Sequence, residues 1–334
     1  MSEIKRRFFT IFACFFLNSF PLFAADDDVE NKKMFSDTNG DIRKIAEDDK
    51  GIFTLAIEND AFSGDDYGYT NGLRVAYTSS EEQMPKFIRQ ASNYLPLLDK
   101  KGKKHINVAL GQSMYTPSNI KTTKFIPNDF IYAGWLYTSI GIVSDTGKAY
   151  DNVVLTLGVV GPSSGAEATQ KFVHHNKPGS AQPKGWDNQL KDEPGVELSY
   201  ERKWREILES HPFGWGFDFM PHIGANLGNV NTSAAVGATF RFGYDLPSDY
   251  GPPRIRPTLP GSDYFIPSKK MSSYLFSVVE ARAVARNIFL DGNTFKDSPS
   301  LEKKTMVKTL QLGMAVTYDD IRLFLHSHFC DQRI

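Results

Sequence analysis

The strongest constraint in this sequence is a recurring alternation of apolar and polar residues over segments of about ten residues. In one segment, Val153, Leu155, Leu157 and Val159 occupy every second position, so a β-strand would carry all four side chains on one face. Residues that favour turns separate the segments. The eleven expected strands are Gly51–Glu58, Thr70–Ser79, His105–Met114, Tyr132–Val143, Asp151–Val160, Val196–Ile207, Gly214–Asn226, Ser233–Tyr244, Ser273–Ile288, Met306–Thr317 and Ile321–Phe329.

The length of these segments favours a membrane barrel over its soluble alternative, a periplasmic β-sandwich of similar strand count. Strands of globular sheets usually have about five or six residues, whereas a tilted strand needs about 9–11 residues to cross a bilayer. Aromatic residues gather near segment ends, among them Trp135, Trp204 and Trp215, as in the interfacial girdles of outer-membrane barrels. We therefore predict an all-β fold, an antiparallel transmembrane outer-membrane β-barrel.

The connections between the expected strands differ greatly in length. Short ones include Ser144–Tyr150 and Leu227–Thr232, and the long ones are 80–104, 115–131, 161–195 and 245–272. We expect the short turns at one end of the barrel and the long loops at the other, which is the usual layout of such proteins.

Composition is compatible with a barrel, because lipid-facing and lumen-facing residues average out along its strands. Hydrophobic residues make up 41% of the chain, and the mean hydropathy is −0.35. No stretch after residue 25 is apolar over the roughly 20 residues that a transmembrane helix needs. The formal net charge of −1 and the lack of a basic stripe argue against nucleic-acid binding.

The N-terminus has the three parts of a secretory signal peptide. A basic stretch, Lys5–Arg7, precedes the apolar run Phe8–Phe20, and the small residues Ala24 and Ala25 follow. A buried N-terminal helix and a lipoprotein signal at Cys14 are the alternatives.

These features divide the chain into three parts. We predict a signal peptide at 1–25, a polar N-terminal extension at 26–50 and a β-barrel domain at 51–334. The exported chain then keeps one cysteine, Cys330, and cannot form an internal disulfide.

Four local motifs give the chain a family resemblance. They are Glu58-Asn59-Asp60; the run Tyr67–Leu73; Tyr115-Thr116-Pro117-Ser118 followed by Lys121, Lys124 and Tyr132–Tyr137; and Gly161-Pro162-Ser163 followed by Gln170–His174 and Gly185–Leu190. Together they resemble the lipid A 3′-O-deacylases and their uncharacterised relatives over about residues 51–329. The resemblance implies an outer-membrane barrel with an even number of strands, about twelve, and ester hydrolysis on lipid A.

The fourth motif carries the candidate general base. The segment Ser163–His175 contains no proline and can form a short helix, in which Gln170 and His174 at positions i and i+4 lie on one face. An imidazole there can act as a general base near neutral pH. Judged from residues alone, a loop histidine is more often an ordinary surface residue, and we interpret His175 in that way. The resemblance makes His174 the candidate base and Gln170 a positioning residue.

Residues around the first two expected strands supply a candidate metal site. The oxygens of Asn59 and Asp60 are ligands of the kind that Ca²⁺ takes, although Asn and Asp are also common in turns. Following the resemblance, we expect Asp60 to bind Ca²⁺ and Asn59 and Thr70 to take part in catalysis. Ordinary strand propensity is the alternative interpretation of Thr70.

Lys121 and Lys124 lie in a long loop, where a cation could hold a lipid A phosphate or stabilise developing negative charge. A solvated loop lysine is the alternative. The resemblance implies a basic residue in this segment, and Lys121 is the candidate. Residues 161–165 match the spacing Gly-x-Ser-x-Gly, and no phosphate-loop motif is present. We expect water activated by a histidine, rather than a serine, to be the nucleophile.

Two features depart from the family pattern. The resemblance implies an acid shortly after the histidine, but residues 176–180 contain no carboxylate, which would weaken catalysis. The strand count of eleven is odd, and the polar tail Cys330–Ile334 stands where a final strand ending in an aromatic residue is expected. We therefore expect the last strand to be missing, as in a truncated or frameshifted copy. Assembly should then fail, because unpaired strand edges are costly in lipid.

The sequence thus predicts a hydrolase of the cell outer membrane that removes the 3′-acyloxyacyl group of lipid A. His174 is expected to activate water while a Ca²⁺ near Asp60 polarises the ester carbonyl. The expected partners are lipopolysaccharide of the outer leaflet and the membrane, with no nucleic acid, and we expect a monomer. The alternative is a non-catalytic or truncated outer-membrane barrel of the same fold.

Overall fold

The computed structural model describes residues 51–59, 68–177, 179–205, 208–210, 214–254, 259–265, 268–319 and 321–330. All of them belong to one compact unit, Ala46–Ile334. The signal peptide predicted at 1–25, the extension predicted at 26–50 and the candidate ligand Asp60 lie outside the described residues. The domain boundaries at residues 25 and 50 therefore stay predictions.

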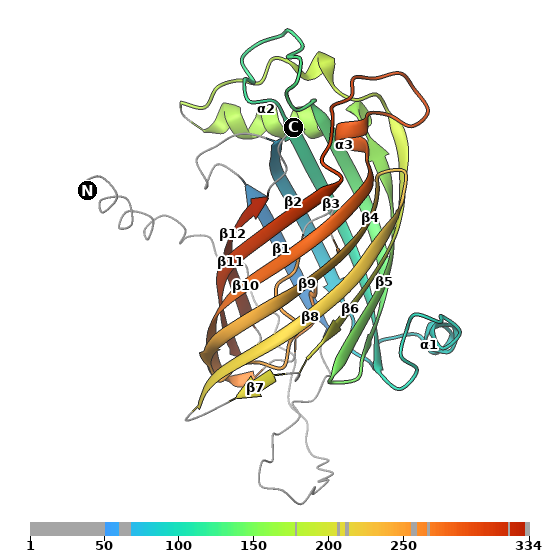
Figure 1. Cartoon of the computed structure of the whole chain (residues 1–334), viewed down its shortest axis with the longest axis vertical. Helices are drawn as coiled ribbons and strands as arrows, with labels where there is room; N and C mark the ends of the chain where they lie inside the picture. Colours follow the sequence, from blue (N-terminus) through green and yellow to red (C-terminus); the bar gives the residue numbers. More distant parts are fainter. Residues whose placement is uncertain are drawn as a thin grey trace, which may run out of the picture. The chain divides into compact units, whose positions relative to one another are not determined.

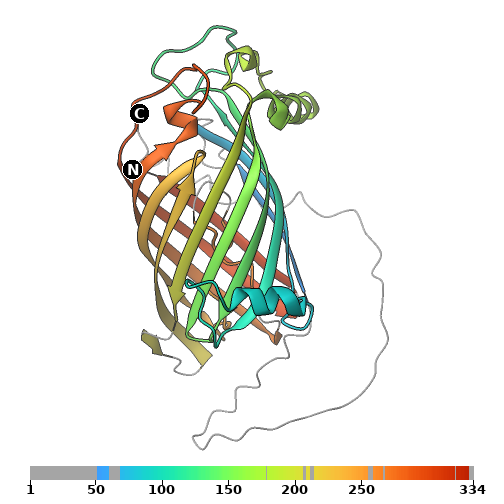
Figure 2. The same ribbon diagram turned by 90° about the vertical axis from the view of Figure 1, so that its right-hand side faces the viewer.

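Antiparallel strands form one sheet that curls into a barrel wall (Figures 1 and 2). The strands are β1 (Ile52–Asn59), β2 (Gly68–Thr78), β3 (Lys103–Thr116), β4 (Ala133–Asp145), β5 (Ala149–Val160), β6 (Glu193–Trp204), β7 (Leu208–Ser210), β8 (Trp215–Gly228), β9 (Asn231–Tyr244), β10 (Ser268–Asn287), β11 (Met306–Asp319) and β12 (Ile321–Cys330). Their order is β1-β2-β3-β4-β5-β6-β8-β9-β10-β11-β12, and β7 pairs with β8.

The alternating pattern produces this wall. Each of the eleven expected strands matches one strand of the continuous order, so the all-β prediction is confirmed. Along β5, Leu155 and Leu157 are exposed while Val154 and Thr156 are buried, as expected when one face meets lipid and the other faces inward. The sequence missed β7, because three residues are too few to show alternation.

The aromatic residues near strand ends divide between the two faces. Trp215 is exposed, as a membrane-interface residue should be, but Trp135 is buried in an interior cluster with Val160, Leu190 and Ile288. The interpretation of Trp135 as an interfacial residue is therefore wrong. Alternation decides this, because Trp135 has the inward-facing parity of β4.

Helices mark the two ends of the barrel. α2 (Ala166–Asn176) and α3 (Ile288–Asp291) lie at one end, the site rim, whereas α1 (Lys86–Ser92) and β7 lie at the other, the opposite rim (Figure 1). Two short 3-10 helices, η2 (Pro162–Ser164) and η3 (Trp186–Asn188), flank α2 in the chain. No helix in the described residues has the length and hydropathy to cross a membrane.

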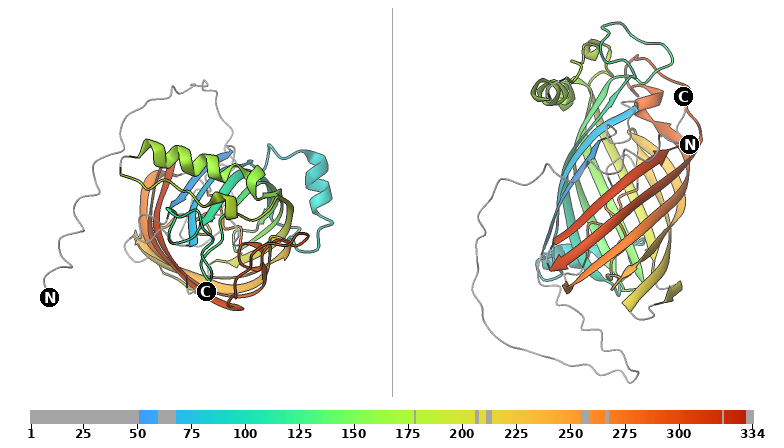
Figure 3. Two further views of the ribbon diagram at one scale, coloured as in Figure 1. Left: turned by 90° about the horizontal axis from the view of Figure 1, so that it is seen from above. Right: turned by 90° about the vertical axis from the view of Figure 1, so that its left-hand side faces the viewer.

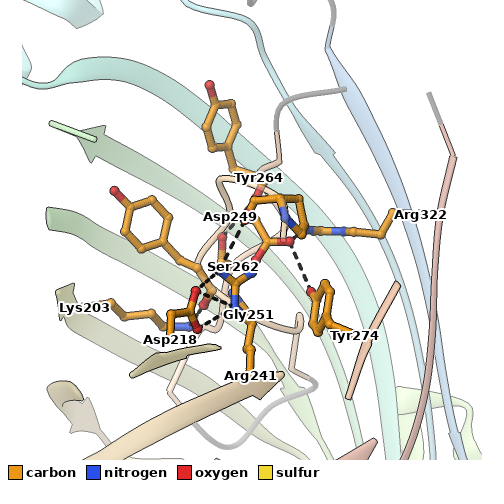
Figure 4. A network of polar contacts seen from close by, with 11 residues as sticks. Lys203, Asp218, Arg241, Asp249, Gly251, Ser262, Tyr264, Tyr274 and Arg322 are labelled. Atoms are coloured by element: carbon orange, nitrogen blue, oxygen red, sulfur yellow. Dashed lines mark hydrogen bonds and ion pairs between the residues drawn. The ribbon is translucent and has the colours of Figure 1, made fainter. Parts of the chain in front are cut away.

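Long connections occur at both rims, so the expected separation of short turns from long loops is wrong. The connection 79–102 and the turn at 146–148 lie at the opposite rim, where β9 ends before and β10 begins after the connection 245–267. Neither long connection extends away from the barrel end as a free loop. The first carries α1 along the outside of the wall (Figure 3), and the described part of the second folds into the interior (Figure 4).

Charge pairs hold the 245–267 connection inside the barrel (Figure 4). Asp263 accepts two hydrogen bonds from Arg74 of β2, at 2.8 and 2.5 Å. Asp249 accepts from Arg241 of β9 at 2.5 Å and from Arg322 of β12 at 2.6 Å. Buried charges are tolerated when they are paired and hydrogen-bonded. The connection thereby joins strands that lie far apart in the sheet order.

The sheet order has two ends, β1 and β12. Because the order contains eleven strands and every neighbouring pair is antiparallel, β1 and β12 run in the same direction. His326 Nε2 of β12 lies 3.8 Å from Glu58 Oε1 of β1, so the two ends approach each other through side chains. The eleven strands of the described order match the odd number that the sequence predicted, and the expected failure of assembly stays a prediction.

Candidate active site

The chain segment around α2 packs against the outer face of the wall at the site rim (Figures 1 and 3). Ala166, at the start of α2, forms one buried cluster with Met114 of β3, Tyr132 and Trp186. Gln112 Nε2 of β3 donates to the Ser164 carbonyl over 2.7 Å. Gln112 and Met114 have the outward parity of the strand, so the start of α2 packs on the outer face of the wall.

Two glycines permit this close packing. A Cβ on Gly134 of β4 would lie 2.0 Å from Ser164 Oγ and 2.5 Å from Ala166 Cβ. Gly165, with a φ of 71°, adopts the left-handed conformation that glycine tolerates best. It interrupts the single helix that the sequence predicted over Ser163–His175 and divides it into η2 and α2.

His174 has a fixed tautomer. Its Nδ1 lies 2.6 Å from the carbonyl oxygen of Ala181. A carbonyl can only accept, so Nδ1 carries the proton of the neutral ring and Nε2 keeps its lone pair. His174 is half-buried, whereas His175 is exposed, as the sequence predicted. The structure thus presents one oriented imidazole nitrogen that can accept a proton.

The Ala181 carbonyl takes the place of the acid that the family resemblance implied beside His174. Residues 176–180 contain no carboxylate, and the chain after α2 brings Ala181 back to the His174 ring. A carbonyl fixes the orientation of a histidine ring much as a carboxylate does. It carries no full negative charge, so it stabilises an imidazolium less strongly.

Gln170, one turn before His174, is almost completely buried, with 2% of its surface exposed. Its Oε1 accepts a hydrogen bond from Trp186 Nε1 over 2.8 Å. Its Nε2 finds no partner in the described part of the chain. An unsatisfied buried donor is costly, and this one belongs to the same helix face as His174. The amide N–H is therefore an unpaired donor among the described residues, on an atom that is fully buried beneath α2.

The loop at 117–132 is held against the segment that follows α2. Lys184 N donates to the Ile120 carbonyl over 2.8 Å, and Asn188 Nδ2 donates to the Thr123 carbonyl over 2.9 Å. Burial raises the pKa of the Tyr132 phenol to about 12, so the neutral hydroxyl donates to the same Ile120 carbonyl. Lys121 directly follows Ile120 and has an exposed side chain, as has Lys124.

A β-bulge positions Thr70. The pairing of β2 with β3 shifts register between Tyr69, which pairs with Tyr115, and Asn71, which pairs with Met114. Thr70 is the extra residue, and its hydroxyl lies 2.7 Å from the hydroxyl of Thr116. Bulges often redirect a side chain beside a functional site. Thr70 is thus a buried bulge residue at the site rim, and it does not follow the ordinary alternation of the strand.

The remaining candidates lie at the end of β1. Asn59 is its last residue and pairs with Asn71, beside Thr70. The structure therefore brings the backbones of Asn59 and Thr70 to the same rim as α2. Among the residues that the structure describes, no group of three or more His, Cys, Asp or Glu could hold a metal ion. Asp60 follows Asn59 and lies outside that set, so its metal role stays a prediction.

Three partners of the candidate residues were missed by sequence reasoning. They are Trp186, the Ala181 carbonyl and Thr116, which contact Gln170, His174 and Thr70 respectively. Trp186 belongs to the Gly185–Leu190 motif, so its place in that motif was the available signal. A backbone carbonyl has no sequence signal, since every residue has one.

Comparison with known proteins identifies the family. A family model described as "Outer membrane protein LpxR" matches residues 9–333. The chain belongs to the LpxR family. This confirms the resemblance to the lipid A 3′-O-deacylases and places the LpxR-family barrel in the outer membrane.

A solved structure supports the fold assignment. LpxR from Salmonella typhimurium resembles this chain with a TM-score of 0.66 and 17% sequence identity, over 85% of this chain and 94% of that one. At this identity the likeness shows that the two LpxR-family chains share a fold. No curated protein sequence matches the chain.

Proposed function

We propose that this LpxR-family protein removes the 3′-acyloxyacyl group of lipid A by hydrolysis, with His174 as the general base. The observation that carries the proposal is the hydrogen bond from His174 Nδ1 to the Ala181 carbonyl. It leaves Nε2 as the proton acceptor, which is the form that a general base requires. A fixed tautomer on a half-buried ring is more specific than a histidine in a sequence motif alone.

The proposed reaction is ester hydrolysis without a covalent enzyme intermediate. His174 Nε2 takes a proton from water, and the water oxygen attacks the carbonyl carbon of the 3′-linked ester. The bond between that carbon and the sugar oxygen then breaks, and the imidazolium returns the proton to the leaving oxygen. The products are a carboxylic acid and a free 3′-hydroxyl. Gln170, one turn before His174 and held by Trp186, has a positioning role.

Exposed apolar side chains suit the entry of a lipid from the side. Leu73 and Val75 of β2 point outward below the site rim, and Phe172 and Val173 of α2 are exposed above it. Phe172 has 71% of its surface exposed. Acyl chains of lipid A in the outer leaflet can contact both sets while the sugar lies between α2 and the wall.

The remaining roles follow the sequence-based hypotheses. Lys121 holds a phosphate of lipid A or shares the charge of the oxyanion, because its loop is fixed to the segment after α2. Asn59 and Thr70, whose backbones lie at the rim of α2, take part in catalysis. Asp60, which follows Asn59, supplies the carboxylate for a Ca²⁺, and that ion when bound would stabilise negative charge at the ester. We propose that the protein acts as a monomer.

The test is the mass of lipid A from cells that express the chain in an outer membrane with unmodified lipid A. The wild type should remove the 3′-linked acyl chains. His174→Ala should lower the rate at least about 100-fold, because positioned bases contribute ~10²–10⁴-fold, whereas His175→Ala should leave it unchanged. Heat-modifiable migration on gels would confirm that each variant assembles. Unchanged lipid A with an assembled wild type would favour the non-catalytic barrel.

A further inference from the structure

An apolar groove lies on the outer wall at the rim away from α2. It has a volume of about 190 Å³ and is lined by Ile88 of α1 and by outward-facing aliphatic residues of β3, β4, β5 and β6. The wall residues are Ile106, Ile140, Ile142, Val153, Leu155 and Leu198. α1 lies outside the barrel wall at this rim (Figures 2 and 3). The groove is therefore open to the membrane and is bounded by a helix on one side.

The α1 segment presents apolar side chains away from the groove as well. Phe87 and Tyr94 have 71% and 87% of their surface exposed, and Leu97 is also exposed. Ile88 is less exposed than these three, because it turns toward the wall. Such a segment fits a membrane interface, where apolar side chains enter the acyl region while polar groups stay at headgroup level.

Basic residues surround this segment. Between residues 79 and 104 there are six Lys and Arg residues against three Asp and Glu residues, which gives a net charge of +3. The exposed cations are Lys86, Lys100, Lys101 and Lys103. Lys103 is the first residue of β3 and lies about 10 Å along the strand from the groove residue Ile106, with the opposite parity. Lys103 thus lies at the rim end of the strand, shortly after Lys100 and Lys101, and a molecule in the groove would meet these cations at the rim rather than on the wall.

We propose that this segment binds one glycerophospholipid, with an acyl chain in the groove and the phosphate against Lys100, Lys101 and Lys103. The choice of lipid rests on the proposed function. If lipid A reaches the site rim from the outer leaflet, then α1 lies at the inner leaflet, where the lipids are phospholipids. An aliphatic groove beside a cationic patch matches the apolar chain and the anionic phosphate of such a lipid.

The test measures phosphatidylglycerol bound to the full chain by native mass spectrometry, with the assembled protein in detergent micelles. The wild type should retain one lipid. Replacing Lys100, Lys101 and Lys103 by Gln should weaken binding about tenfold, since charge contacts of exposed side chains are individually weak. Ile88→Asn should weaken it similarly by removing the apolar wall of the groove.

A matched control removes three lysines near the site rim, Lys296, Lys304 and Lys308, and should leave phosphatidylglycerol binding within about twofold. A second arm supplies lipid A, whose binding the Lys100, Lys101 and Lys103 changes should not weaken. The inference is overturned if these changes and Ile88→Asn leave phosphatidylglycerol bound, or if lipid A is what they lose. Ile88, Lys100 and Lys101 lie outside the barrel strands and Lys103 is the first residue of β3, so heat-modifiable migration verifies assembly.

The two proposals can fail separately. A protein that binds phosphatidylglycerol here but leaves lipid A unchanged disproves the deacylase proposal alone. A protein that deacylates lipid A but shows no lysine-dependent phosphatidylglycerol binding disproves the phospholipid site alone.

Discussion

Two hydrogen bonds orient the polar side chains of α2. Trp186 Nε1 donates to Gln170 Oε1, and His174 Nδ1 donates to the Ala181 carbonyl. Both partners come from the 181–190 stretch that follows the helix. The position of this stretch therefore sets the direction of the amide donor and of the imidazole lone pair together, as a second layer of contacts commonly does around reactive groups.

The substitution Trp186→Phe tests this orientation by removing one hydrogen-bond donor, Trp186 Nε1. The ring keeps its packing in the cluster with Met114 and Ala166, but the Gln170 amide loses its orienting donor. We expect deacylation to slow about tenfold, since one hydrogen bond is worth about 1–1.5 kcal/mol. The measurement is the rate of 3′-acyl release by the purified protein. Trp215→Phe at the opposite rim is the control, and an equal loss in both variants would contradict the role of Trp186.

At the scale of elements, the contact between η2, α2 and the outer face of β4 holds the site together. Gly134 provides the space for it, and Gly161 N donates to the Gly134 carbonyl over 2.9 Å. We place the substrate beside this contact. A change that separates them should act on activity without disturbing the strand ladder, because the ladder is made by backbone atoms.

Gly134→Ala is the corresponding prediction. The new Cβ would lie 2.0 Å from Ser164 Oγ and 2.5 Å from Ala166 Cβ, so η2 and the start of α2 must move. Misplacement by about 1 Å can cost on the order of 10²-fold in rate. We expect such a loss of deacylation with unchanged heat-modifiable migration. Leu136→Ala, at an outward position of the same strand, should stay near wild-type activity, and a similar loss there would argue against a specific α2 contact.

At the scale of the whole barrel, buried charge pairs join the described part of the 245–267 connection to the wall. Asp263 is paired with Arg74 and also accepts from Asn107 Nδ2 over 3.1 Å. Burial alone would raise the pKa of Asp263, but the charge of Arg74 outweighs it and holds that pKa below its usual value. The native barrel thus favours the ionised carboxylate.

The lowered pKa of Asp263 predicts that the folded barrel loses stability in acid. A carboxyl with a depressed pKa contributes stability above its unfolded value of about 3.9, and the contribution is lost as pH falls through the folded pKa. We expect the temperature of heat modification to fall when the pH is lowered through about 4. Asp263→Asn should lower that temperature at neutral pH and reduce its further fall in acid. If the variant and the wild type show equal pH dependence, other carboxylates are responsible.

The sheet ends give the last prediction. β1 and β12 run in the same direction, so one strand placed between them could pair antiparallel with both. Unpaired edge groups are costly in lipid, since no water is available to bond them. A chain extended after Ile334 by ten alternating residues ending in Phe should therefore resist heat modification and protease better than the 334-residue chain. A scrambled extension of equal composition is the control, and equal resistance would show that the edges are satisfied in another way.

The sequence alone determined the strands, because alternation of period two is a local property that each segment carries by itself. It also placed Gln170 and His174 on one helix face, since their spacing of four residues fixes this in any α-helix. Tertiary structure decided the rest. The bulge at Thr70 depends on register with β3, the tautomer of His174 depends on a backbone carbonyl, and Asp263 meets Arg74 across 189 positions of sequence. Contacts of this kind arise only when the curled sheet brings distant segments together, and no local pattern encodes them.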